Sequence, residues 1–234
     1  MTLKALTKHL RSFGDPDRAK KVMCYFKAGP GEYGEGDIFL GIKVPVLRAI
    51  ARKFKGLSFS DTTSLLKSKF HEERFVALVL LVGAYKSGNQ QEKERIFELY
   101  CSHTKFINNW DLVDISAEHI MGAYLENKPK EPLYLFSRSS CVWERRISVL
   151  STFHYIKQGN FSETLQIAKL LLNDPEDLIQ KAVGWMLREI GKRDLATEEG
   201  LLARYYKQMP RTMLRYAIEK FPEERRKKYL KGLI

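Results

Sequence analysis

Cysteine is scarce in this chain of 234 residues, which has only three cysteines: Cys24, Cys101 and Cys141. They lie far apart and form no CxxC pair, so a disulfide framework and a cysteine-based zinc site are both disfavoured. The five histidines form no HxxxH or HExxH pattern either. We therefore expect a protein of a reducing compartment that needs no metal and no organic cofactor.

Long apolar runs are also missing. The longest, FVALVLLVGAY at 75–85, is shorter than the roughly 20 residues that a membrane-spanning helix needs. The N-terminal MTLKALTKHLRSFG has the spacing of an amphipathic helix and not the pattern of a signal peptide. These features predict a soluble cytoplasmic protein in which 75–85 is a buried core helix.

Alternating apolar and polar residues, the signal of half-buried strands, are almost absent. Apolar residues instead recur at helical spacing, as in VPVLRAIARKF and SVLSTFHYI. Pro45 and Pro175 stand where helices would begin. The sequence therefore predicts an all-α fold.

Similar segments recur along the chain, each at the end of an expected helix. They centre on Phe54, Tyr85, Tyr124, Ile156 and Ile190, separated by about 31 to 39 residues. Helix pairs with such a period are typical of HEAT-like solenoids, which present a concave face. Since no segment resembles a linker, we predict a single HEAT-like domain over residues 1–234. A non-repeating helical bundle is the alternative.

The segment AGPGEYGEGD, 28–37, formally contains a GxGxxG pattern. No strand precedes it, and Glu32, Glu35 and Asp37 would repel a phosphate, so a nucleotide-binding loop is rejected. We expect a surface loop between helices.

Positive charge is in excess. Forty Lys and Arg against 28 Asp and Glu give a formal net charge of +12, which favours a polyanionic partner such as nucleic acid over a basic enzyme with a solvated surface. Basic residues near helix starts combine with backbone N–H groups to attract phosphate, which makes Lys43 and Arg48 the best candidates for DNA contact. Lys181, Arg188 and Arg215 are the further candidates.

The segment NNWDLVD, 108–114, places chemistry-bearing residues together. In a helix running through 108–121, Trp110 and Asp114 share a face because they are four residues apart. WERRISVL supplies Arg145 and Arg146, and IQKAVGWMLRE supplies Trp185. Equivalent helices of a right-handed solenoid would line these groups along one groove. Individually, each is more often a core, capping or surface residue.

Four segments, FLGIKVPVLR, NNWDLVD, WERRISVL and IQKAVGWMLRE, resemble the AlkD-like family of DNA alkylation repair enzymes, bacterial alkylpurine glycosylases built from HEAT-like repeats. The resemblance extends from about Leu3 to the final helix. It implies that Asp114 is the catalytic aspartate, that Trp110 and Trp185 are active-site tryptophans, and that Arg146 lies beside them. Two features depart from the family: the loop at 28–37 is longer, and Lys-Val follows FLGI.

The resemblance implies a monofunctional glycosylase, most simply a monomer, that removes cationic N3- or N7-alkylated purines from duplex DNA in base excision repair. An alkylated purine leaves as a neutral base, while a carboxylate stabilises the cation formed on the sugar. Indole faces also attract cations. One alternative is a non-catalytic HEAT-repeat protein that binds damaged or branched DNA. A more distant one is a solenoid that binds other proteins.

Overall fold

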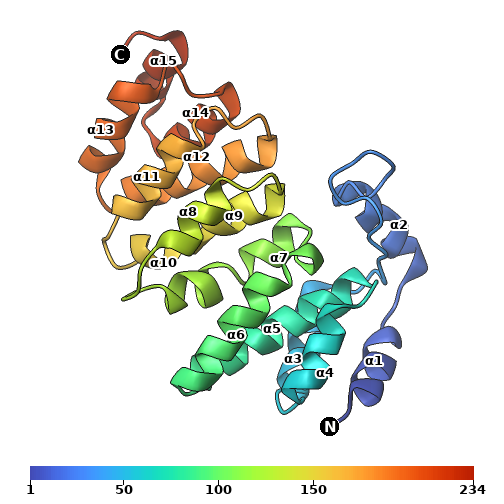
Figure 1. Cartoon of the computed structure of the whole chain (residues 1–234). Helices are drawn as coiled ribbons and strands as arrows, with labels where there is room; N and C mark the ends of the chain where they lie inside the picture. The colour runs from blue at the N-terminus through green and yellow to red at the C-terminus, as the bar shows by residue number, and fades with distance from the viewer. The chain divides into compact units, whose positions relative to one another are not determined.

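The computed structural model describes all residues from 1 to 234, and every regular element in it is a helix (Figure 1). The only strand-like feature is an isolated bridge between Ile38 and Phe70. None of the helices combines the length and the apolar character that a membrane crossing requires. The predicted all-α class is confirmed. The chain divides into two compact units, Met1–Ile120 and Met121–Ile234.

The first unit begins with two short helices and is built around α5. Its elements are α1 (Leu3–Arg11), α2 (Pro16–Tyr25), α3 (Val44–Lys53), α4 (Phe59–Leu66), α5 (His71–Ser87), α6 (Gln90–Ser102), η1 (Thr104–Phe106) and α7 (Trp110–Asp114). Side chains of Thr2, Asp15, Ser58 and Asn89 accept backbone N–H groups at four of the helix starts, as N-caps do. Pro45 lies in the first turn of α3, as predicted.

Helix α5 forms the core of this unit. Twelve of its 17 residues are buried, and it packs against α3, α4 and α6. The apolar run at 75–85 is therefore a core helix, as predicted. The start of α5 is unusual because four consecutive polar residues, His71, Glu72, Glu73 and Arg74, are buried. Buried charges require partners, and these partners organise the surrounding loops.

Glu72 fixes the FLGIK segment. Its carboxylate accepts the backbone N–H groups of Leu40 at 2.8 Å, Gly41 at 2.8 Å and Ile42 at 3.3 Å. Gly41 has φ of +78°, and a Cβ there would lie 2.2 Å from the Asp15 carbonyl oxygen. Only glycine suits both the backbone conformation and the space.

The predicted helix through 108–121 is interrupted, and this expectation was wrong. Helix α7 ends at Asp114, a turn follows at 115–117, and a π-helical segment, η2, spans Glu118–Gly122. The Ser116 hydroxyl donates to the Leu112 carbonyl at 2.6 Å and lies 2.9 Å from the Tyr100 hydroxyl. Such back-bonding by serine bends helices, and π-helical turns arise where the regular ladder is broken.

The second unit is built around α12. It contains α8 (Glu131–Ser137), α9 (Val142–Ser151), α10 (Phe153–Ile156), α11 (Ser162–Leu170), α12 (Asp177–Gly191), α13 (Leu195–Tyr205), α14 (Arg211–Ala217), η3 (Ile218–Lys220) and α15 (Glu223–Lys231). Helix α12 packs against α9 and α14. Gly184 permits the close approach of α14, since a Cβ there would lie 2.4 Å from the Met213 carbonyl oxygen.

The repeat positions read from the sequence fall near the ends of helices. Phe54 caps α3, Tyr85 lies in the last turn of α5, Ile156 ends α10 and Ile190 lies in the last turn of α12. Tyr124 lies in a short helical turn that follows η2. The recurring segments therefore mark helix ends within each unit, as the sequence predicted.

Candidate active site

Helix α7 carries two of the predicted site residues on one face. Trp110 is its first residue and Asp114 its last, and both side chains are half-buried. Leu112 and Val113 are fully buried on the other side of the helix. Asn109 caps the helix, with its side-chain oxygen 2.8 Å from the Trp110 backbone nitrogen. The indole and the carboxylate are thus held four residues apart on a rigid turn.

Trp110 belongs to a stack of aromatic rings. Its centroid lies 5.2 Å from that of Phe26, with the planes 21° apart. Phe26 stacks on Phe39 at 5.3 Å, and Phe39 on the His71 imidazole at 4.7 Å. Ring pairs at such distances add stability beyond the area they bury. The stack therefore joins the site helix to the end of α2 and to the FLGIK segment.

Tyr25 is a site candidate that the sequence analysis missed. It ends α2, its ring lies 5.8 Å from that of Trp110 in an edge-on arrangement, and it is 67% exposed. An exposed aromatic ring beside a second aromatic ring provides a surface for stacking bases or attracting cations. The only sequence signal was the pair Tyr25-Phe26, which Lys27 separates from the glycine-rich segment.

A buried ionic network lies behind the stack. The His71 imidazole is 2.9 Å from Asp37 through Nδ1 and 2.9 Å from Asp111 through Nε2. Arg74 donates to the second oxygen of Asp37 at 2.5 Å, and Asn108 donates to the same oxygen at 3.0 Å. Two carboxylates face two cationic groups, so the network is balanced in charge.

The network keeps His71 protonated. Burial on its own would lower the pKa of His71, but the Asp111 and Asp37 carboxylates outweigh burial and raise this pKa to about 9. Burial likewise favours a higher pKa for Asp37, yet the hydrogen bond from His71 and the charge of Arg74 hold that pKa below its usual range. At neutral pH the imidazolium therefore joins the Asp37 carboxylate to the Asp111 carboxylate in α7.

The glycine-rich segment at 28–37 is only partly the surface loop that we expected. Ala28, Gly34 and Asp37 are buried, and Asp37 is the centre of the ionic network. The reason is the close packing of Gly34, where a Cβ would lie 2.6 Å from the Phe26 carbonyl oxygen and 3.1 Å from Nδ2 of Asn109.

The loop's own carboxylates use the N–H groups that a phosphate-binding loop would offer. Glu32 accepts the Gly29 N–H and Glu35 accepts the Gly31 N–H, both at 2.9 Å. The geometry therefore agrees with rejecting the nucleotide-binding interpretation of the GxGxxG pattern.

The second unit carries the other two predicted residues. Trp185 is half-buried in α12, donates to Glu189 at 3.3 Å and lies 6.0 Å from the Phe153 ring. Arg146 is 5% exposed in α9 and donates to the Leu178 carbonyl at 2.7 Å. Arg145, which could equally have been chosen from the sequence, instead pairs with Asp174 at 2.7 Å.

The structure thus brings Trp110 and Asp114 together within the first unit, and it places Trp185 and Arg146 in the second. A shared groove for all four residues stays a prediction. No group of three His, Cys, Asp or Glu side chains is arranged to hold a metal ion.

The predicted DNA contacts differ in their surroundings. Lys43 caps α3 and is exposed, and Arg48 is exposed with its guanidinium 5.9 Å from the Phe75 ring centre. Arg215 is exposed on α14. Lys181 pairs with Asp177 at 2.6 Å, and Arg188 pairs with Glu219. DNA would have to compete with Asp177 and Glu219 to bind Lys181 and Arg188.

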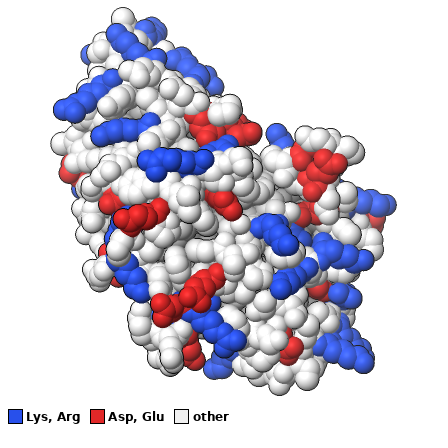
Figure 2. All heavy atoms as spheres, viewed as in Figure 1, with Lys and Arg blue, Asp and Glu red and all other residues white.

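Basic side chains are spread over the face drawn in Figure 2, with acidic side chains between them. In the basic C-terminal helix α15, Arg225 pairs with Glu199 and Arg226 with Glu223. Partly exposed pairs of this kind are typical of a solvated helix face.

Comparison with known proteins assigns the family. The family model described as DNA alkylation repair enzyme matches residues 6–221. A predicted DNA alkylation repair enzyme from Enterococcus faecalis has a similar structure, with a TM-score of 0.71 and 17% identity over 90% of this chain and 97% of that one. AlkD2 from Streptococcus mutans gives a TM-score of 0.53 and 16% identity over 95% of this chain and 100% of that one.

A search of curated protein sequences gives no match. The similar structures confirm the predicted all-α helical-repeat fold, and the family model covers most of the chain. The chain therefore belongs to the DNA alkylation repair enzyme family.

Proposed function

We propose that the protein is a DNA glycosylase that hydrolyses the N-glycosidic bond of cationic N3- or N7-alkylated purines in duplex DNA, as a step of base excision repair in the cytoplasm. Both units would act as one repair domain over residues 1–234, as a monomer and without a metal or cofactor. The product would be an abasic site.

One observation carries the proposal: a half-buried carboxylate, Asp114, and an indole, Trp110, share one face of a helix that a buried ionic network holds in place. The family membership makes damaged DNA the substrate to test first. A protein-binding solenoid gives no reason for an anion and an aromatic ring to be held together in this way.

The chemistry fits these residue types. Alkylation at N3 or N7 makes the base a cation, so it departs as a neutral molecule without a general acid. As the bond breaks, positive charge develops on the deoxyribose, and Asp114 would stabilise this charge and orient the attacking water. Trp110 and Trp185 would attract the cation through their ring faces, with about 0.5–2 kcal/mol from each.

The basic residues would hold the DNA. Lys43, Arg48 and Arg215 would contact phosphates directly, while Lys181 and Arg188 would exchange their carboxylate partners for phosphate. Arg146 is buried against the Leu178 carbonyl, so it would have to leave this carbonyl to help clamp the backbone near the lesion. Phosphate contacts of this kind make affinity fall as salt rises.

Release of 7-methylguanine from a duplex oligonucleotide tests the proposal. We expect free base in solution and an intact strand that breaks only after alkali treatment, since no group for strand cleavage is proposed. Salt-dependent binding without base release would contradict the methylpurine glycosylase and favour the non-catalytic DNA-binding alternative. Absence of both binding and release would favour a protein-binding solenoid.

A further inference from the structure

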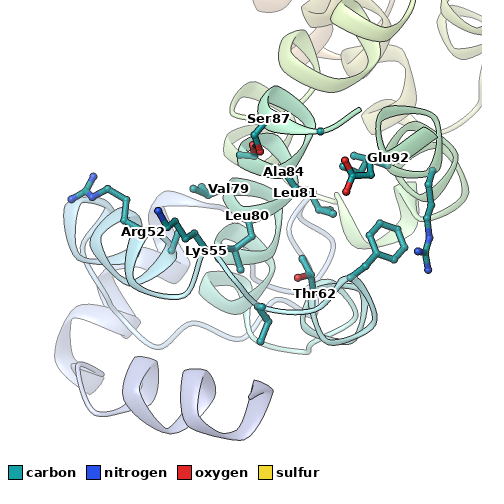
Figure 3. Close-up of a pocket in the computed structure, with 16 residues that line it drawn as sticks. Arg52, Lys55, Thr62, Val79, Leu80, Leu81, Ala84, Ser87 and Glu92 are labelled. Carbon is teal, nitrogen blue, oxygen red and sulfur yellow. Dashed lines mark hydrogen bonds between the residues drawn. The ribbon is translucent and has the colours of Figure 1, made fainter. Parts of the chain in front are cut away.

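The first unit contains a cavity of about 800 Å³ that the proposed reaction does not use. Figure 3 shows its lining, which comes from the end of α3, the start of α4, the second half of α5 and the start of α6. His71 begins α5 at the ionic network, whereas Ser87 ends it at the cavity. A helix of 17 residues is about 25 Å long, so the two sites lie at opposite ends of α5.

The floor of the cavity is apolar. Gly83 and Ala84 of α5 are exposed there and Val79 is half-buried, with the buried side chains of Leu80 and Ile96 also in the lining. The volume lies within the range of about 300–1,000 Å³ that is usual for small-molecule sites. The floor therefore suits the body of a small apolar ligand.

Gly83 has no packing role that requires glycine. A Cβ there would meet no atom within 4 Å, whereas one at Gly122 or Gly184 would lie within 2.4 Å of a backbone oxygen. Glycine inside a helix costs about 1 kcal/mol relative to alanine. Its effect here is to leave the backbone of α5 open at the cavity floor.

The rim is positively charged. Arg52, Lys55 and Arg95 line it, and none of them is in an ion pair. Lys55 and Arg52 stand on the α3 side, opposite Glu92 (Figure 3). The Glu92 carboxylate accepts the Asn89 backbone N–H at 2.8 Å in a capping box, so it is turned toward its own helix start.

Arg95 also provides a flat surface. Its guanidinium lies 3.9 Å from the centre of the Phe59 ring, and both residues line the cavity. A stacked guanidinium and ring can accept a further planar group, and the guanidinium can bind an anion at the same time.

From the apolar floor, the stacked Arg95 and the unpaired cations, we propose that this cavity binds a small aromatic anion, with its ring over Gly83 toward the Arg95–Phe59 pair and its acidic group toward Lys55 on the α3 side. The proposal does not depend on glycosylase activity, because the cavity and the Trp110–Asp114 site share no residue.

A pair of fluorescent dyes tests it: 8-anilinonaphthalene-1-sulfonate and its uncharged analogue N-phenyl-1-naphthylamine. The full chain should bind the sulfonate saturably at one site, and the uncharged dye about tenfold more weakly. Gly83→Leu fills the floor without a backbone clash and should weaken sulfonate binding by about tenfold or more. Lys55→Glu should weaken binding of the sulfonate and leave binding of the uncharged dye unchanged.

Three control variants test whether the changes in dye binding come from the cavity itself. Gly200→Leu is the control for Gly83→Leu, since a Cβ at this helical glycine also meets nothing within 4 Å. Lys67→Glu controls for charge at an exposed position outside the cavity, and Trp110→Ala excludes binding at the proposed active site. Circular dichroism confirms that each variant is folded.

Equal sulfonate binding by the wild type and Gly83→Leu would overturn the proposal, as would equal affinity for the two dyes. Competition by AMP and by benzoate then identifies the class of ligand. Displacement of the sulfonate at a lower concentration of AMP would indicate a nucleotide, and displacement at a lower concentration of benzoate would indicate a simple aromatic acid.

Discussion

Nε2 of His71 lies 2.9 Å from a carboxylate oxygen of Asp111, and this contact joins the start of α5 to the start of α7. Because Nδ1 binds Asp37 at the same distance, one protonated ring connects the site helix to the end of the glycine-rich segment. Trp110 directly precedes Asp111, so its position depends on this network.

Removing the imidazole should destabilise the first unit. His71→Ala leaves the buried Asp37 and the half-buried Asp111 without their shared partner. Breaking a buried ionic network costs about 3–5 kcal/mol. We expect a loss of this size in the free energy of unfolding, measured with urea. His103→Ala, at a half-buried histidine outside the network, should cost less than about 1 kcal/mol. A similar small loss for both variants would contradict the role of the network.

Stability should decrease in alkaline solution. The pKa of His71 is raised from 6.5 to about 9, so its stabilising effect is complete below about pH 6.5 and is lost as pH rises through about 9. Urea unfolding of the wild type at pH 6.5, 8 and 9.5 should show a falling free energy. His71→Gln should show a much smaller change, and an equal change in both proteins would rule out His71 as its source.

Two glycines with the same backbone conformation should respond differently to alanine. Gly41 and Gly31 have φ of +78° and +76°, but a Cβ would clash with the Asp15 carbonyl oxygen only at Gly41. Gly31→Ala should cost about 1 kcal/mol for the backbone alone. Gly41→Ala should cost distinctly more, about 2–4 kcal/mol, since the FLGIK segment must move. Equal losses in thermal unfolding would show that the contact relaxes freely.

Tyr25 should contribute to substrate binding and hardly to stability, because its ring is mostly exposed beside Trp110. Tyr25→Ala should weaken binding to lesion-containing DNA by about tenfold, the value of one stacking contact, and change the unfolding free energy by less than about 1 kcal/mol. Tyr25→Phe should bind like the wild type. Loss of binding in Tyr25→Phe would point to the hydroxyl instead of the ring.

Features that depend on residues close together in the sequence were predicted correctly. Helical spacing revealed the core helix at 75–85, and the separation of Trp110 from Asp114 revealed that they share a face. The break after Asp114 was missed because a serine within a helical pattern does not by itself predict one. In the structure the Ser116 hydroxyl bonds to the Leu112 carbonyl and also contacts the Tyr100 hydroxyl of α6. Periodicity carries no information about such tertiary contacts.

The ionic network was missed for the same reason. His71 lies 34 residues from Asp37 and 40 from Asp111 in the sequence, and no local pattern relates them. An aspartate in a glycine-rich, acidic segment is expected at the surface, and Asp37 is buried only because Arg74 and His71 neutralise it. Tyr25 was missed as well, because only the structure shows that its ring, at the end of α2, lies beside the Trp110 ring of α7.

We propose that the essential role of Asp114 is to stabilise the cation formed during base release. Its most direct test is the single-turnover rate of 7-methylguanine release by the wild type and by Asp114→Asn, with Asp17→Asn as a control at an exposed aspartate of α2. We predict a loss of about a hundredfold or more in Asp114→Asn, with DNA affinity retained and the control unaffected. Release at the wild-type rate by Asp114→Asn would contradict this role of Asp114.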